Sequence, residues 1–126
     1  MKLSVIGVGY VGLVTGACFA QTGNQVICMD KDKKKIKTLE QGKAPFFEPG
    51  LDELVQRNSK EGRLRFTTDI SDAVSNSSII LIAVGTPSQP DGSADISMVL
   101  KVAQSIAKVM KEYGRNKDRS WEVRKL

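Results

Sequence analysis

A glycine-rich turn near the start of the chain constrains the fold more than any other feature. Leu3, Val5 and Ile6 predict a short apolar strand, and Gly7, Gly9 and Gly12 follow at the spacing G-x-G-x-x-G. In a strand–turn–helix unit these glycines allow a tight turn, close approach of a pyrophosphate, and close packing of the helix on the strand. Residues 11–20 are apolar and rich in small residues, which predicts that helix. The start of the helix is therefore a candidate phosphate site.

An acidic residue at the end of a second predicted strand supports this interpretation. Residues 24–30 (NQVICMD) end in Asp30, 18 positions after Gly12. In dinucleotide-binding folds a carboxylate about 20 residues beyond the glycines binds the ribose hydroxyls of adenosine. A carboxylate repels a 2′-phosphate, so the sequence favours NAD over NADP. The alternative, that Asp30 caps the following helix, is compatible with this role.

The rest of the chain alternates helices and strands. Apolar spacing predicts helices over 31–42, 51–55, 70–74 and 96–113. Strands are predicted over 62–69, where one face is polar, and over 78–84, where a continuous apolar run indicates burial on both faces. This alternation predicts an α/β fold, a Rossmann-like doubly wound parallel sheet of about four strands in the order 3-2-1-4.

The last predicted helix carries apolar residues at helical spacing, and Asp95 is a suitable N-cap for it. The apolar positions are Ile96, Val99, Leu100, Ala103, Ile106, Ala107 and Met110. We expect these residues to form the face that packs on the sheet.

Two loops contain further candidate ligand contacts. The fourth predicted strand runs into Gly85 and Thr86, at the edge of the sheet where ligands bind in open α/β folds. Gly85 lets a ligand approach and Thr86 offers a hydroxyl, unless the segment is only the exit from the strand. The loop at 43–50 contains adjacent phenylalanines followed by Glu48. It is either a loop pinned by both phenylalanines or a rigid wall beside the ligand with Glu48 as a polar contact.

Composition limits the classes of function. Among 126 residues the net charge is +5, but residues 1–113 carry 14 Lys and Arg against 12 Asp and Glu, and residues 114–126 carry 5 against 2. Because the body of the chain is nearly balanced, we expect no nucleic-acid partner. No apolar run approaches the roughly 20 residues of a membrane span, and the first strand leaves no room for a signal peptide. We expect a cytoplasmic protein without a membrane partner.

The chain lacks histidine, the commonest general base and metal ligand, and has only two cysteines. Cys18 lies in the apolar first helix and Cys28 in the second strand, and we expect both to pack as small buried hydrophobes. A nucleophilic thiolate needs an electropositive, accessible setting, which neither position offers. We therefore expect neither a catalytic residue nor a metal site in this chain.

Four stretches, taken together and in order, resemble the UDP-glucose/GDP-mannose dehydrogenase family. They are VIGVGYVGL, VICMDKDKKKI, APFFEPGL and VGTP, and the resemblance covers residues 1 to about 114. It is closest to bacterial members that act on UDP-glucose. It implies the NAD-binding domain of an oxidoreductase whose full-length relatives oxidise UDP-glucose to UDP-glucuronate in two NAD-dependent steps.

The resemblance also assigns cofactor contacts to individual residues. It implies that Tyr10 and Val11 line the pyrophosphate site and that Asp30 holds the ribose. It selects Lys35 as the lysine of its helix that contacts the cofactor, a choice that spacing alone does not make. It matches Thr86 to a further NAD contact.

The family's nucleophilic cysteine, its lysine, asparagine and aspartate partners and its dimerisation helix belong to a sugar-nucleotide half beyond residue 126. We therefore expect a truncated chain that binds NAD without catalysis, with a UDP-sugar as ligand only in a full-length relative. One alternative is a stand-alone NAD-binding or regulatory module that pairs with another chain. Another is a Rossmann dehydrogenase of the hydroxyacyl-CoA type, which would leave FFEPGL unexplained.

The end of the chain departs from the family, whose members continue into a valine-rich fifth strand. Here the residues GRNKDRSWEVRKL are polar and basic. We interpret 1–114 as the NAD-binding domain and 115–126 as an atypical basic tail, produced by a shifted reading frame or a truncation. Without a fifth strand, residues 78–84 form an edge with unpaired backbone groups. We expect an incomplete sheet that self-associates through this strand unless the tail covers it.

Overall fold

In the computed structural model, which describes residues 1–114 and 120–126, five parallel strands form one sheet in the order β3-β2-β1-β4-β5. The strands are β1 (Lys2–Ile6), β2 (Gln25–Met29), β3 (Leu64–Thr67), β4 (Ile79–Ile82) and β5 (Glu122–Lys125). The helices are α1 (Tyr10–Gln21), α2 (Lys33–Glu40), α3 (Leu51–Lys60), α4 (Ile70–Ser75) and α5 (Ser97–Tyr113).

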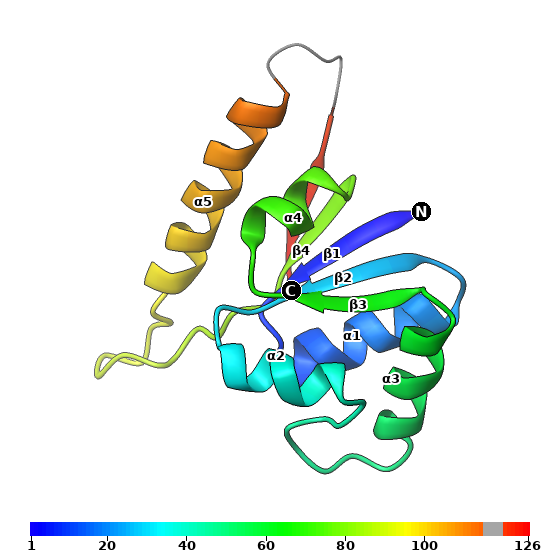
Figure 1. The fold of residues 1–126 in the computed structure, drawn as a ribbon. Coiled ribbons are helices and arrows are strands. Elements are labelled where there is room, and N and C mark those ends of the chain that lie inside the picture. The colour runs from blue at the N-terminus through cyan, green and yellow to red at the C-terminus, as the bar shows by residue number, and fades with distance from the viewer. Residues whose placement is uncertain (115–119) are drawn as a thin grey trace.

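Helices cover both faces of the sheet (Figure 1). Helices α1, α2 and α3 lie on one face, and α4 and α5 lie on the other. The alternation of side chains along the strands gives each face its own core. Val5 and Cys28 belong to the cluster beneath α1, whereas Ile6 and Ile80 belong to the cluster beneath α4 and α5. The prediction of a doubly wound, Rossmann-like α/β fold is confirmed.

Helix α1 packs closely on the sheet because four of its five buried residues are glycine or alanine. A Cβ atom at Gly16 would lie 2.7 Å from Sγ of Cys28, so a larger residue would push the helix off β2. Cys28 is fully buried, as expected, but Cys18 is exposed on the outer side of α1. The prediction that Cys18 packs in the core is therefore wrong.

A fifth strand covers the edge of β4. Strand β5 pairs with β4 from Ile79 opposite Glu122 to Ile82 opposite Lys125. Trp121, just before β5, packs against the core beneath α4 and α5, and its indole N–H donates a hydrogen bond of 3.0 Å to the carbonyl oxygen of Val74.

This pairing overturns two predictions about the end of the chain. The sheet has a fifth strand rather than stopping after four, and β4 is an internal strand rather than an edge. Self-association through an exposed β4 thereby loses its structural basis. The other part of the predicted tail, residues 115–119, lies outside the described residues.

Helix α5 packs through a narrower face than the sequence predicts. The residues that contact the core are Val99, Val102, Ile106, Val109 and Met110. The predicted core residues that the structure instead leaves exposed are Ile96, Leu100, Ala103 and Ala107. The helix begins at Ser97, whose N–H donates to Oδ1 of Asp95 at 2.9 Å. Asp95 thus satisfies a free N–H at the start of α5, but the N-cap is Ile96, one position later than predicted.

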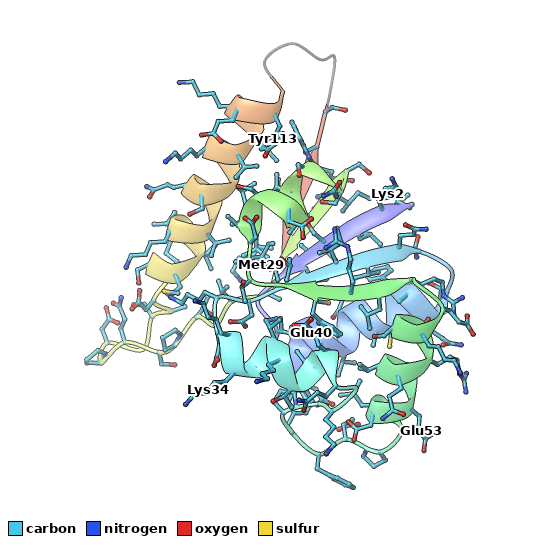
Figure 2. All side chains as sticks on the ribbon, in the orientation of Figure 1. Lys2, Met29, Lys34, Glu40, Glu53 and Tyr113 are labelled. Carbon is cyan, nitrogen blue, oxygen red and sulfur yellow. The ribbon has the colours of Figure 1, made fainter. Side chains whose placement is uncertain are left out.

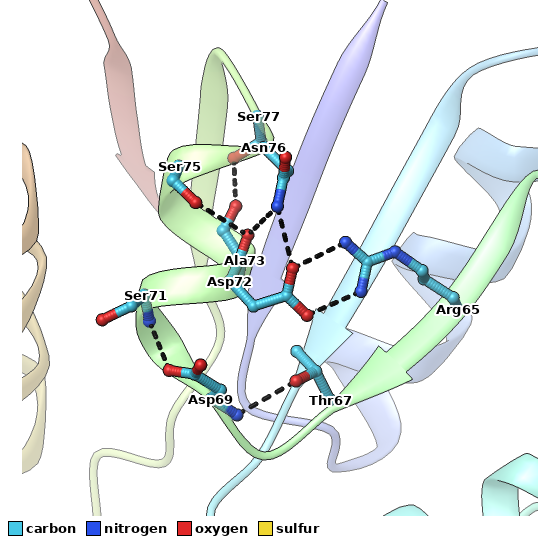
Figure 3. A network of polar contacts seen from close by, with 9 residues as sticks. All are labelled: Arg65, Thr67, Asp69, Ser71, Asp72, Ala73, Ser75, Asn76 and Ser77. Carbon is cyan, nitrogen blue, oxygen red and sulfur yellow. Dashed lines mark hydrogen bonds and ion pairs between the residues drawn. The ribbon is translucent and has the colours of Figure 1, made fainter. Parts of the chain in front are cut away.

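A polar network fastens α4 to the edge strand β3 (Figure 3). The guanidinium of Arg65 donates two hydrogen bonds, of 2.7 and 2.8 Å, to the two carboxylate oxygens of Asp72. Asn76 donates a third, of 2.8 Å, to the same carboxylate. Hydrogen bonding to Arg65 holds the pKa of Asp72 below its ordinary value. The network fixes α4, whose first residue, Ile70, lines the cavity described next.

Candidate cofactor-binding site

A cavity of about 470 Å³ lies at the carboxyl ends of β1, β2 and β4. Its volume is in the range of pockets that hold small molecules and cofactors. The strand order reverses between β1 and β4, and open α/β sheets bind ligands at such a switch point. In Figure 2 the label of Met29 marks this end of the sheet, and Lys2 lies at the opposite end. Residues of the turns after these three strands line the cavity.

The three glycines of the first turn have different roles. Gly7 has a φ of +103°, and a Cβ there would lie 2.9 Å from the backbone of Ala83. A Cβ on Gly12 would lie 1.9 Å from the carbonyl oxygen of Gly7. Nothing lies within 4 Å of a Cβ built on Gly9. The fold therefore requires Gly7 and Gly12, whereas Gly9 keeps open the space in front of α1.

The start of α1 faces this open space. Gly9 is the N-cap of the helix, it offers no side-chain cap, and the first turn holds no acidic residue. The N–H groups and the positive end of the helix dipole are therefore available to an anion. Tyr10 and Val11 are 54% and 56% exposed at this end of the helix.

The loop at 43–50 is tied to the same turn of α1. The hydroxyl of Tyr10 donates to Oε2 of Glu48 at 3.3 Å, and the Tyr10 and Phe46 rings lie 5.3 Å apart between centroids. Phe46 also packs on the core, but Phe47 is 90% exposed. One phenylalanine pins the loop, not two. The loop lies beside the start of α1 without lining the cavity.

The Asp30 carboxylate is held in place at the wall of the cavity. Its Oδ2 accepts a hydrogen bond of 2.9 Å from the N–H of Val8, and its Oδ1 accepts one of 3.0 Å from the N–H of Asp32. The ammonium of Lys35 lies 3.5 Å from Oδ2. The N-cap of α2 is Asp32, whose carboxylate accepts from the first turn of the helix. Asp30 is therefore not the cap of α2, and its carboxylate faces the cavity.

The structure brings together five of the nine predicted site residues. Those that line the cavity are Gly7, Gly9, Asp30, Lys35 and Gly85. Those outside the lining are Tyr10, Val11, Gly12 and Thr86. Gly12 acts through packing, and Thr86 follows Gly85 at the rim.

Sequence reasoning missed the opposite wall. The apolar residues Ile70 from α4 and Met98 and Val102 from α5 also line the cavity. Lys101 and Ser105, four positions apart on α5, add polar groups. Their spacing places them on one side of the helix, but only the packing of α5 brings that side to the cavity.

The sequence model that describes the NAD binding domain of the UDP-glucose/GDP-mannose dehydrogenase family matches residues 1–116 of this chain. The chain belongs to this family. The UDP-glucose 6-dehydrogenase of Rhizobium meliloti (strain 1021) is 55% identical over 108 residues, which are 85% of this chain and 25% of that protein. The GDP-mannose 6-dehydrogenase of Pseudomonas putida is 39% identical over 115 residues, which are 91% of this chain and 26% of that protein. The chain thus spans about a quarter of the length of these curated relatives.

Solved structures of the family agree with the fold. A ternary complex of GDP-mannose dehydrogenase from Pseudomonas aeruginosa matches 99% of this chain and 28% of that chain, with a TM-score of 0.91 and 38% identity. A UDP-glucose dehydrogenase from Pyrobaculum islandicum matches 90% of this chain and 26% of that chain, with a TM-score of 0.85 and 38% identity. A 3-hydroxyacyl-CoA dehydrogenase from Archaeoglobus fulgidus, at 21% identity and a TM-score of 0.59, shares the fold alone.

The chain is therefore an NAD-binding domain of this dehydrogenase family, and NAD is its cofactor. Within residues 1–114 and 120–126, no group of three or more His, Cys, Asp or Glu side chains could hold a metal ion. None of the described helices combines the length and hydropathy that crossing a membrane requires.

Proposed function

We propose that this chain is the cofactor-binding part of a UDP-glucose 6-dehydrogenase, an enzyme that oxidises UDP-glucose to UDP-glucuronate with two NAD. The chain binds NAD and does not catalyse the oxidation by itself. The observation that carries the proposal is the pairing of an open space at Gly9 with the Asp30 carboxylate held beside it. The 55% identity to the Rhizobium meliloti UDP-glucose 6-dehydrogenase favours UDP-glucose over GDP-mannose as the substrate of the complete enzyme.

Each part of the cofactor has a place in the proposed mode of binding. The pyrophosphate lies over Gly9 at the start of α1, where Tyr10 and Val11 form the rim. The adenosine ribose donates its hydroxyls to Asp30, and Lys35 neutralises negative charge on the cofactor. Gly85 and Thr86 contact the cofactor at the end of β4. The bound NAD supplies the hydride acceptor, and this chain's residues bind and orient it.

The thiols of the chain do not supply the nucleophile that the complete enzyme needs. Neither Cys18 nor Cys28 lines the cavity. Burial raises the pKa of Cys28 to about 12, so its thiol stays protonated at neutral pH. The sequence also lacks histidine. A UDP-sugar would bind to the additional part of a full-length relative.

We further propose that residues 1–114 hold the cofactor, that 120–126 complete the sheet, and that the protein acts in the cytoplasm, where NAD is available. Two measurements test whether the chain binds NAD without catalysis. NAD is titrated into the protein, and UDP-glucose is then added while the absorbance of NADH is followed. We expect saturable binding of NAD and no NADH. Formation of NADH by the chain alone would show that it is catalytic.

A chimera tests whether this chain can serve as the cofactor-binding part of a UDP-glucose 6-dehydrogenase. Residues 1–114 of this chain replace the matching segment of the Rhizobium meliloti enzyme. The chimera is expected to reduce NAD with UDP-glucose, and the same chimera carrying Asp30→Ala is expected to lose most of this activity. A folded chimera that binds UDP-glucose but does not reduce NAD would contradict the proposal.

A further inference from the structure

The lysines that line the cavity differ in what their ammonium groups contact. The ammonium of Lys35 lies 3.5 Å from Oδ2 of Asp30, so a carboxylate of the protein already compensates part of its charge. Lys31 follows that carboxylate directly in the sequence. Lys101 comes from α5 instead, and its ammonium has no ion pair or hydrogen bond with any residue that the structure describes. Its positive charge is therefore available to a ligand.

The neighbours of Lys101 on α5 cannot neutralise this charge. On a helix, side chains three and four positions apart lie next to one another. Those around Lys101 are Ser97, Met98, Gln104 and Ser105, and none of them is acidic. The hydroxyl of Ser105 donates a hydrogen bond of 3.1 Å to the carbonyl oxygen of Lys101, so its proton is engaged within the helix. In the described lining, Lys101 is thus the group of α5 that is suited to an anion.

The described lining has an excess of positive charge. Its charged residues are Asp30, Lys31, Lys35 and Lys101, so three ammonium groups stand against one carboxylate. The pyrophosphate of NAD is a dianion, which has the opposite sign to this excess. Because the walls of a cavity have a low dielectric constant, they focus the field of such charges on the ligand. The cavity is therefore complementary in charge to the phosphate part of the cofactor.

We propose that Lys101 is a further cofactor-binding residue, whose ammonium attracts the pyrophosphate of NAD from the side of α5. A lysine acts on phosphate as a point charge on a flexible stem, so its side chain can adjust to the ligand. The cofactor is then held by charge from α1 and from α5, two helices that lie on opposite faces of the sheet (Figure 1). This inference rests on the proposed NAD site, because it assumes that the pyrophosphate lies over Gly9.

The test compares adenosine, which has no phosphate, with 5′-ADP and NAD as ligands of the whole chain. Ligand-observed NMR at several concentrations measures the affinities, including weak ones. Lys101→Met keeps a long side chain of similar helix propensity and removes the charge. We expect it to weaken binding of 5′-ADP and NAD about fivefold, the effect of one solvent-screened charge, and to leave binding of adenosine unchanged. Lys101→Arg should restore most of the lost affinity.

Two controls separate a local charge from other effects. Lys108→Met removes an exposed lysine of the same helix that lies outside the cavity lining, and it should leave all three affinities unchanged. Raising the salt concentration screens exposed charges, so the difference between wild type and Lys101→Met should shrink at high salt. Urea denaturation verifies that both methionine variants are folded.

Three results would overturn the inference. They are undiminished binding of 5′-ADP by folded Lys101→Met, an equal loss for adenosine and 5′-ADP, and an equal loss in Lys108→Met. The second would indicate a contact with the adenine or a merely structural effect, and the third an effect of net charge alone. Failure of folded wild type to bind NAD would overturn the proposed function as well, whereas normal binding by wild type with an unchanged variant overturns this inference alone.

Discussion

The backbone N–H of Val8 donates a hydrogen bond of 2.9 Å to the carboxylate of Asp30, 22 positions further along the chain. This bond joins the glycine turn after β1 to the end of β2. The glycine turn and the Asp30 carboxylate, which we propose as cofactor contacts, are therefore held in fixed relation to each other. A preorganised site spends less binding free energy on ordering its own groups.

Substitution by alanine should lower the stability of the fold strongly at Gly12 and only slightly at Gly9. Gly12→Ala places a Cβ 1.9 Å from the carbonyl oxygen of Gly7, so we expect a loss of about 3 kcal/mol or more in the free energy of unfolding. Gly9→Ala meets no atom within 4 Å, and we expect a change of less than about 1 kcal/mol. Urea denaturation of both variants checks this. Equal destabilisation would contradict the packing described for the turn.

Much of this site follows from the sequence because its geometry is local. The glycine spacing requires a strand, a turn and a helix in immediate succession, and Asp30 ends the next strand. The position of Lys101 does not follow, because it depends on how α5 packs across the cavity. The exposure of Cys18 was missed for a different reason. Helix α1 contains no charged residue, so periodicity does not identify its outer side.

Strand β5 was missed because its pairing is not encoded locally. Four residues with three charges, EVRK, have little strand propensity of their own. Pairing with the edge of β4 and the packing of Trp121 supply the stabilisation that the low strand propensity of EVRK does not. Tertiary contacts therefore decide the structure of this segment.

Trp121→Ala should expose the edge of β4. The substitution removes the hydrogen bond to Val74 and the packing that holds the segment before β5. We expect β5 to detach and the chain to associate through β4, since unpaired strand edges recruit further strands. Light scattering after size exclusion should show a monomer for wild type and larger species for the variant. Trp121→Phe, which keeps a ring, is the control, and a monomeric Trp121→Ala protein would contradict this role of β5.

The Arg65–Asp72 pair should stabilise the fold in a pH-dependent way. The two side chains are 49% and 30% exposed, so we expect Asp72→Asn to cost about 0.5–1 kcal/mol at neutral pH. The pKa of Asp72 is lowered in the folded state. The contribution is therefore complete above the unfolded pKa of about 3.9 and is lost as the pH falls through the lower folded pKa.

Unfolding of wild type and Asp72→Asn at several pH values checks this prediction. The difference between them should be constant above about pH 5 and should shrink below about pH 4. A double-mutant cycle with Arg65→Met isolates the pair from other effects of each substitution. A difference that is the same at acid and neutral pH would contradict the ionic origin of the effect.

The two thiols should differ sharply in reactivity. Cys18 is exposed, whereas Cys28 is buried and burial raises its pKa to about 12. In native protein we expect a thiol reagent to label one cysteine quickly, and Cys18→Ser to remove that labelling. Cys28 should react only after unfolding, when its pKa returns to about 8.5. Equal rates for both thiols in the native state would contradict the packing of α1 on β2.

Calorimetric titration of NAD into the whole chain, and into its Gly9→Val variant, tests the cofactor site most directly. The wild-type chain should bind one NAD in a saturable manner. Gly9→Val should retain the fold, as circular dichroism can verify, and lose binding, because its side chain fills the space in front of α1. Absence of NAD binding by folded wild-type protein, or undiminished binding by the variant, would contradict the site described.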